Sequence, residues 1–145
     1  MIEGLDRAAL TEVFLSRRSA IREALADSIT ALPMEFLEVC EDTSVLFRFT
    51  PERWMRNPSD VVHGGIVCTM LDNAMGSVSG TLAGKMTPTV NMQVDFIRPV
   101  RLDTPILVRV ECITQGSTLC RMRASLWQEK ESKPCASGTA VYFSK

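Results

Sequence analysis

The sequence predicts an α+β fold in which a long, buried helix packs against one curved antiparallel sheet. Three observations lead to this prediction. The segment from Gly64 to about Ala83 is apolar or small on nearly every side, which is typical of a buried helix. Two short strand-like runs precede it and three or four longer runs follow it, separated by turns or prolines. A stretch rich in helix-forming residues comes first in the chain.

Length and composition predict one globular domain. The chain has 145 residues, of which 46% are apolar, and nothing divides it in two. A formal charge of −1 and a pI near 5.9 argue against a general nucleic-acid binder, which usually has a strongly basic face. Residues 1–7 carry acids where a signal peptide needs a basic start, and no apolar run is long enough to cross a bilayer. We therefore expect a cytoplasmic protein that binds neither nucleic acid nor membrane.

The cysteines predict buried, reduced thiols and no metal site. Their number is odd, no pair has CxxC spacing, and the chain contains one histidine. Such thiols usually behave as small hydrophobic side chains. They are Cys40, Cys68, Cys112, Cys120 and Cys135.

The first elements are one or two amphipathic helices between Leu5 and about Ala31. Apolar or small residues recur there at a spacing near four, and Pro33 ends the region. We expect residues 1–32 to form a helical extension and residues 33–145 to form the main globular unit.

A hairpin follows, with strands at Phe36–Cys40 and Ser44–Phe49 around the turn 41–43. The segment Pro51–Val62 contains two prolines and several turn-forming residues, so we expect a loop that leads to His63 and the long helix. The strand-like runs after that helix are Thr87–Arg98, Ile106–Thr114, Thr118–Gln128 and Cys135–Phe143.

The second and third of these runs are expected to pair about Gly116, which gives one wholly apolar face. This register sets Glu111 opposite Arg121, a favourable pair, and Arg109 opposite Arg123, a repulsive one. The two arginines either point into water or hold an anion between them. The apolar pairs in this register are Cys112 with Cys120, Val110 with Met122, and Val108 with Ala124.

Residues around the start of the long helix carry a family resemblance. A histidine is followed by two glycines, an asparagine stands six residues before it, and an acid stands nine residues after it. The run 94–100 adds a strand that ends in an aromatic-x-x-Pro pattern. With these features, the segment 36–143 resembles the hotdog-fold acyl-CoA thioesterases of the phenylacetic-acid-degradation and thioesterase-superfamily-member-2 kind. The motif residues are Asn57, His63, Gly64, Gly65 and Asp72.

The chemistry of thioester hydrolysis can be assigned to these residues. Charge builds on the carbonyl oxygen in the transition state, while water or a carboxylate attacks the carbonyl carbon. Gly64 and Gly65 lack Cβ, so a thioester can approach the backbone, and the Gly65 N–H at the helix start can donate to the oxyanion. Asp72 is the candidate nucleophile or general base. The alternative is a buried acid with a structural hydrogen bond.

The spacing of Gly65 and Asp72 predicts an assembly. Seven residues separate them, so they share a helix face but lie about 10 Å apart along the axis, too far apart for one reacting carbon. Two antiparallel helices side by side would bring Gly65 of one subunit near Asp72 of the other, in a twofold dimer. The resemblance implies the same homodimer, with pairing into tetramers common.

Three polar residues have both a functional and a structural interpretation. His63 either helps to shape the site or bonds to the loop at the helix entry. Asn57 either places its amide against the attacking water or thioester oxygen, or is an ordinary turn residue before Pro58. Thr89 falls where the resembling family often has a hydroxyl that could hold the water, although β propensity also explains a threonine.

The phosphates of coenzyme A need cations. The alternative for each candidate cation is a solvated surface residue. We expect no cofactor, since coenzyme A is part of the substrate. The candidates are Lys85, Arg98, Arg101 and Arg123.

The leading hypothesis is hydrolysis of acyl-CoA to free acid and coenzyme A. A hotdog protein that binds acyl-CoA without turnover, as a sensor or regulator, is the alternative, and it would not need Asp72. An enoyl-CoA hydratase ranks last, because it would want an Asp/His pair on one loop. Met70, Met75 and Met92 are expected to line the acyl pocket, which suits medium-chain or aryl groups.

Overall fold

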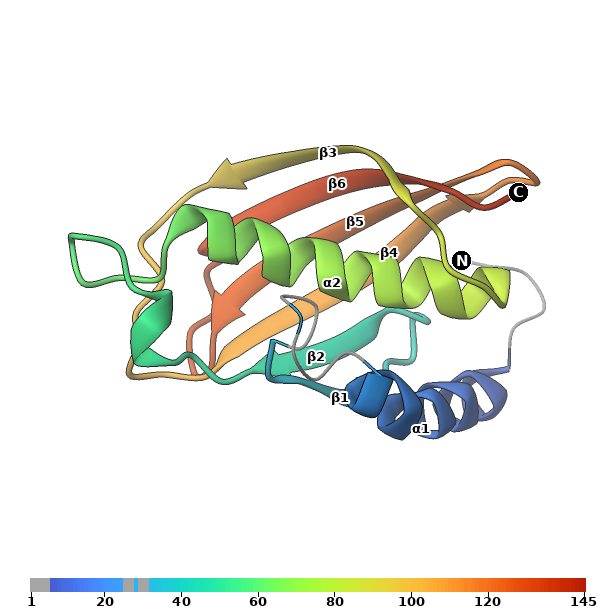
Figure 1. The fold of residues 1–145 in the computed structure, drawn as a ribbon, viewed down its shortest axis with the longest axis horizontal. Helices are drawn as coiled ribbons and strands as arrows, with labels where there is room; N and C mark the ends of the chain where they lie inside the picture. The colour runs from blue at the N-terminus through green and yellow to red at the C-terminus, as the bar shows by residue number, and fades with distance from the viewer. Residues whose placement is uncertain (1–5, 25–27, 29–31) are drawn as a thin grey trace.

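The fold is a six-stranded antiparallel sheet with one long helix lying across it (Figure 1). The computed structural model describes residues 6–24, 28 and 32–145. The strand order is β1-β2-β4-β5-β6-β3, so β1 and β3 are the two edges. The predicted α+β class, with a long buried helix against a curved antiparallel sheet, is confirmed.

Every element expected between residues 33 and 145 is present, with bounds that differ from the expected ones by two residues or fewer. The helices are α1 (Arg7–Ala24), the 3₁₀ turn η2 (Arg53–Met55) and α2 (Gly64–Ala83). The strands are β1 (Met34–Val39), β2 (Val45–Phe49), β3 (Thr89–Phe96), β4 (Ile106–Gln115), β5 (Leu119–Gln128) and β6 (Ala136–Phe143).

The helix α2 is the centre of the core, and it contacts strands β2 through β6. His63 caps its N-terminus, and Gly84 ends it in the left-handed conformation with φ of 69°, which glycine adopts without strain. Its 20 residues make it about 30 Å long. The buried side chains of α2 are Val67, Met70, Leu71, Ala74, Met75, Val78 and Ser79.

The register of β4 and β5 differs from the expected one. Cys112 pairs with Met122 rather than Cys120, and Glu111 pairs with Arg123 rather than Arg121. The turn closes one residue later than Gly116, where the Gly116 N–H donates to the carbonyl of Leu119, and a bulge lies between Cys112 and Thr114. The displacement is two residues along most of the ladder, so the apolar face is preserved.

This register removes the expected repulsion between Arg109 and Arg123. Arg109 lies opposite Ser125 and bonds to Ser44 at 2.6 Å and to Asp42 at 3.2 Å. Arg123 lies 3.7 Å from Glu111 across the ladder. Because each guanidinium has its own acid, the hypothesis of an anion held between the two arginines is wrong.

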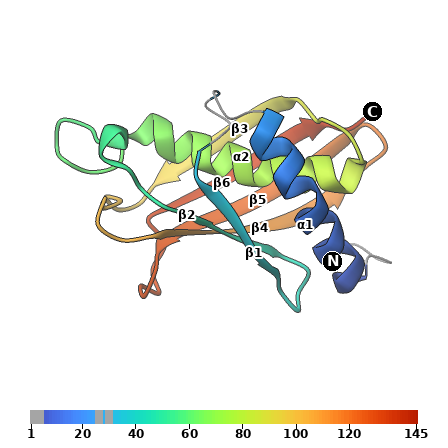
Figure 2. The same ribbon diagram turned by 60° about the horizontal axis from the view of Figure 1, so that its bottom comes forward.

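The helix α1 packs beside α2 on the same face of the sheet (Figure 2). Phe14 stacks on Phe36 with ring centroids 5.1 Å apart, and it meets the edge of Phe47 at 6.0 Å. Leu10 and Phe14 belong to the same core cluster as α2. The described part of the N-terminal region therefore shares one core with the rest of the chain. A second helix before residue 32 would fall at 25–31, where only residue 28 is described.

Replacing Phe14 by alanine should lower the free energy of unfolding by about 3 kcal/mol, because the change leaves a cavity beside the two remaining rings, Phe36 and Phe47. Urea unfolding measures the effect. Leu15→Ala is the matched control on the same helix, since Leu15 is 53% exposed and Phe14 only 5%. Equal losses in the two variants would show that α1 does not pack on the core in solution.

Candidate active site

Asp72 is the centre of the candidate site, half-buried on the side of α2 that faces β3 and β6. The Thr89 hydroxyl donates to its Oδ1 over 2.9 Å. The Tyr142 hydroxyl donates to the same oxygen over 2.9 Å and lies 3.2 Å from the Asp72 carbonyl oxygen. Within the described part of the chain, Oδ2 accepts no hydrogen bond. The structure thus brings Asp72 and Thr89 together as a pair and leaves one carboxylate oxygen available.

Sequence reasoning missed Tyr142. It is the only tyrosine in the chain, and it is 1% exposed. Burial, followed by the Asp72 charge, raises the pKa of Tyr142, so the hydroxyl stays protonated and acts as a donor. A single tyrosine in an otherwise apolar strand is a weak signal, because a buried phenol needs a hydrogen-bond partner but the sequence does not identify it.

The N-terminus of α2 holds the three residues His63, Gly64 and Gly65. The Gly65 N–H donates to Nδ1 of His63 over 2.9 Å, so the imidazole acts as the helix cap. The Gly64 N–H has no hydrogen-bond partner among the residues that the structure describes. The backbone donors expected for an oxyanion are present, but the Gly65 donor is occupied by His63.

The side chain of Asn57 closes the turn that precedes α2. Its Oδ1 accepts the N–H groups of Ser59 at 2.9 Å and Val61 at 3.3 Å, which closes the turn before the helix. The Asn57 backbone also bonds to Val61 and Asp60. The side-chain oxygen is therefore engaged in the loop, and the contact of the amide with the attacking water or thioester oxygen stays a prediction.

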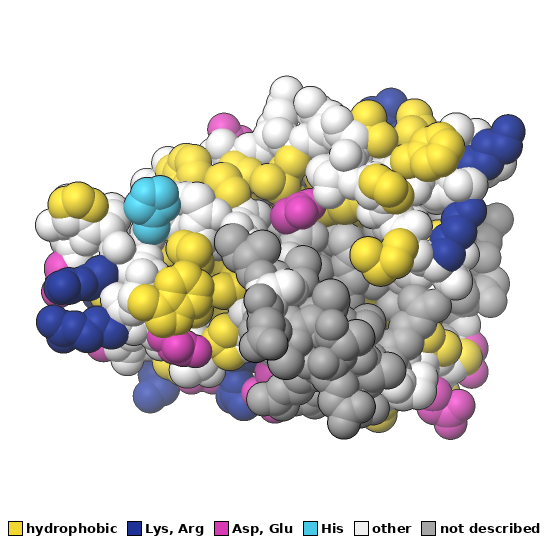
Figure 3. Space-filling view, in the orientation of Figure 1, with side chains coloured by type: hydrophobic (Ala, Val, Ile, Leu, Met, Phe, Trp, Pro, Cys, Tyr) yellow, Lys and Arg dark blue, Asp and Glu magenta, His cyan; other side chains and the backbone are white. Residues whose placement is uncertain are grey.

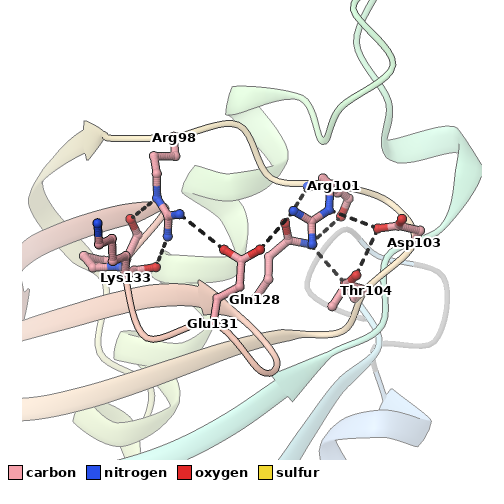
Figure 4. A network of polar contacts seen from close by, with 8 residues as sticks. Arg98, Arg101, Asp103, Thr104, Gln128, Glu131 and Lys133 are labelled. Atoms are coloured by element: carbon pink, nitrogen blue, oxygen red, sulfur yellow. Dashed lines mark hydrogen bonds and ion pairs between the residues drawn. The ribbon is translucent and has the colours of Figure 1, made fainter.

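Arg98 and Arg101 are held in a polar network near the N-terminus of α2 (Figure 4). Glu131 lies between them, 3.3 Å from Arg98 and 2.9 Å from Arg101. Arg98 also donates to the carbonyls of Lys133 and Pro134. A phosphate that binds either guanidinium would have to compete with Glu131.

The buried Gln128 fixes the backbone of the same loop. Its Oε1 accepts the Arg101 N–H at 3.1 Å, and its Nε2 donates to the Arg101 carbonyl at 3.0 Å. Because Gln128 is 1% exposed, these bonds form away from water and hold the loop tightly.

The other two candidate cations lie elsewhere. Lys85 is exposed just after the C-terminal end of α2, the end opposite to His63. Arg123 points to the outer face of the sheet, since its neighbours Met122 and Ala124 point inward. There it lines a groove of about 410 Å³ with Gln93, Asp95, Ser137, Gly138 and Thr139. Within one chain, Lys85 thus lies at the far end of α2 from His63, and Arg123 lies on the face of the sheet opposite to α2.

The face along which α2 runs carries exposed apolar groups. Figure 3 shows hydrophobic side chains gathered around the histidine on this face. Large side chains that are more than half exposed occur near the helix start and on β3, among them Trp54 (58%), Val90 (58%) and Phe96 (59%). The Phe96 ring lies against Gly64. An apolar surface of this kind on both sides of a polar site marks a place where a ligand or another protein surface binds.

The described residues contain neither a cluster suited to a metal ion nor a membrane-spanning helix. No group of three or more histidine, cysteine, aspartate or glutamate side chains there is arranged to hold a metal ion. No helix there has the length and apolar character needed to span a membrane.

The comparison with family models identifies one family, and solved structures share its fold. The family model described as the thioesterase superfamily matches residues 60–135. A search of curated protein sequences finds no match. Among solved structures, zebra fish thioesterase superfamily member 2 is similar with a TM-score of 0.79 at 21% identity, over 90% of this chain and 98% of that chain.

Two bacterial structures are also similar. One is the Escherichia coli PaaI protein from the phenylacetic acid degradation operon, with a TM-score of 0.79 at 18% identity, over 94% of this chain and 96% of that chain. The other is a hypothetical thioesterase from Streptococcus pneumoniae in a structure with coenzyme A. Its TM-score is 0.68 at 22% identity, over 76% of this chain and 86% of that chain. These likenesses show the hotdog fold expected from the sequence.

Proposed function

The chain belongs to the thioesterase superfamily, and we propose that it hydrolyses acyl-CoA to free acid and coenzyme A. The observation that carries the proposal is the half-buried Asp72 carboxylate, which two hydroxyls hold by a single oxygen. A carboxylate with one free oxygen beside an apolar surface is equipped to attack a thioester or to activate water. A similar thioesterase from Streptococcus pneumoniae has been solved with coenzyme A, which supports the substrate class.

Asp72 acts through Oδ2 in either of two ways. As nucleophile, Oδ2 attacks the thioester carbon and the thiolate of coenzyme A leaves, giving an acyl anhydride that water then hydrolyses. As general base, Oδ2 takes a proton from a water that attacks the same carbon, and the thiolate leaves as the tetrahedral intermediate collapses. Each route gives one carboxylic acid and one thiol per water consumed. No cofactor is needed for either route.

The Gly65 N–H is proposed as the oxyanion donor. In the free chain it donates to Nδ1 of His63, so the thioester oxygen has to replace the imidazole. That exchange becomes favourable as negative charge develops on the oxygen, because donors to a charged acceptor form stronger hydrogen bonds. Gly64 allows the substrate to approach and supplies a neighbouring N–H.

Two copies of the chain are proposed to build each site. Gly65 and Asp72 lie on one helix about 10 Å apart, so a single thioester cannot reach both in one chain. The edge strand β3 and the apolar groups near Asp72 are exposed, as expected for a surface that pairs with a second copy. The dimer would place Gly65 of one protomer by Asp72 of its partner, and pairing of dimers would use another surface. A protein that is monomeric at active concentrations would contradict this assembly.

The alternative function is binding of acyl-CoA without turnover. One observation favours it: the proposed oxyanion donor is already used by His63. A binder, however, has no need for a carboxylate that is held by two hydroxyls next to the ligand. The cations near the helix start, Arg98 and Arg101, would serve either function as phosphate ligands.

Incubation of the purified protein with a panel of acyl-CoA thioesters tests the proposal. We expect release of the free thiol of coenzyme A, detected with a thiol reagent, with kcat on the order of 1 s⁻¹ or more for the best substrate. Medium-chain and aryl groups should be compared, since the methionine-lined core suits both. Binding of acyl-CoA with no thiol release from any member of the panel would favour the alternative function.

A further inference from the structure

A bulge in β3 turns Thr89 toward the helix. Past the bulge, Met92 and Val94 point inward and Asn91 points outward, in the usual alternation of a strand. Strict alternation would send Thr89 outward with Asn91. The register instead steps from Thr89 opposite Tyr142 to Asn91 opposite Val141, so Val90 is an extra residue. The extra residue reverses the direction of Thr89, as bulges do beside active sites.

The same register places Thr89 and Tyr142 directly opposite each other on neighbouring strands. Their hydroxyls both reach Oδ1 of Asp72 over 2.9 Å. We call this pair of hydroxyls the hydroxyl clamp. Because both members hold one oxygen of a carboxylate that has only two χ angles, they fix the direction of the other oxygen.

We propose that Tyr142 is the positioning residue of the reaction, which holds the Asp72 carboxylate so that Oδ2 faces the thioester. This inference rests on the proposed function, since it presumes that Asp72 reacts. Tyr142 itself touches neither the thioester nor the water and acts only through Asp72.

The surroundings of Tyr142 suit a fixed donor. Its side chain is 1% exposed, and its ring lies beside Gly76 of α2, where an added Cβ would be 3.5 Å from the ring. A buried phenol hydroxyl is costly unless it makes a hydrogen bond, and its partner here is Asp72. Burial and the Asp72 charge raise the pKa of Tyr142, so the phenol remains a donor at any working pH.

The test is Tyr142→Phe, which removes one oxygen and keeps the ring. We expect kcat to fall by about 10- to 100-fold while KM changes by less than about twofold, because a small misorientation of a reacting group slows the chemical step without weakening substrate binding. A merely structural role would instead change stability or KM together with kcat. Ser79→Ala is the matched control: it removes another fully buried hydroxyl, one that forms no hydrogen bond with Asp72.

A second measurement does not depend on that variant folding. Since Tyr142 is the only tyrosine, growth with 3-fluorotyrosine labels this position alone. We expect its ¹⁹F resonance to move in Asp72→Asn and to stay in place in Ser79→Ala, because only the first change alters the acceptor of the phenol.

The outcomes separate the positioning role of Tyr142 from the proposed function. Unchanged kcat in Tyr142→Phe, or an unmoved resonance in Asp72→Asn, overturns the positioning role. If Asp72→Asn is inactive in the same assays, the proposed function stands without the positioning role. If Asp72→Asn retains full activity, the assignment of Asp72 is wrong and the positioning role of Tyr142 with it. If the wild-type protein releases no thiol from any acyl-CoA, the proposed function itself is wrong. A reduced kcat that Ser79→Ala reproduces also overturns the positioning role.

Discussion

Asp72→Asn should lower kcat by about 10²- to 10⁴-fold, the contribution typical of a positioned acid–base or nucleophilic group. The substitution keeps the size of the side chain and an acceptor for Thr89 and Tyr142, so the fold and the oligomer should be unchanged. What it removes is the second carboxylate oxygen, since an amide nitrogen neither attacks a thioester nor takes a proton from water. Thiol release from the best acyl-CoA of the panel measures the loss.

Asp95→Asn is the matched control for Asp72→Asn. Asp95 is an exposed carboxylate on β3 that lines the groove on the outer face of the sheet, away from α2. The same change of chemistry should therefore leave kcat within about twofold, as is usual for exposed surface positions. Wild-type turnover in Asp72→Asn would refute the assignment of Asp72 and show that another group activates the attack on the thioester.

The fold could be predicted well because its signals are local. The continuous apolar run, the two glycines at its start and Gly84 at its end mark α2 without any knowledge of its neighbours. The strands are marked by the alternation of buried and exposed side chains, which is also a local signal. Asp72 was identifiable because an acid within such an apolar helix is costly and needs a reason to be there.

The features that could not be predicted depend on the register between paired strands. Two bulges, at Val90 and at Ile113, each insert a residue that alternation alone does not reveal. The first decides that Thr89 faces Asp72 opposite Tyr142, and the second helps to change every partner in the β4–β5 hairpin. Tyr142 was missed because its partner is 70 residues away in the sequence.

The ion pairs of two candidate cations could not be predicted for a related reason. Arg98 and Arg101 flank a proline close to the helix start, and their positions suggested free guanidinium groups. The acid that holds both, Glu131, comes from the loop between β5 and β6, and only the folded chain brings it near. Their positions in the sequence therefore did not reveal that a phosphate would compete with Glu131 for them.

Gly65→Pro should lower kcat by about 10²- to 10³-fold, the cost of deleting one oxyanion donor. Proline removes the N–H and also displaces the His63 imidazole, since a Cβ added at this position would lie 3.1 Å from Nδ1. The first turn of a helix tolerates proline because its N–H groups have no intrahelical partner, and the preceding residue, Gly64, has no Cβ to clash with the ring. KM should change less than kcat, because the donor acts mainly on the charge that develops in the transition state.

Gly65→Pro removes both the oxyanion donor and the helix cap, because the Gly65 N–H also bonds to His63. The effects of these two losses on kcat have to be measured separately. His63→Ala removes the cap and keeps the N–H, so it should cost about 1 kcal/mol of stability and change kcat far less than Gly65→Pro. Gly64→Pro removes the neighbouring N–H and tests the other donor. If Gly64→Pro loses activity while Gly65→Pro keeps it, the oxyanion donor is Gly64, and His63 and Gly65 remain bonded throughout the reaction. Normal turnover in both proline variants would show that the start of α2 does not stabilise the oxyanion.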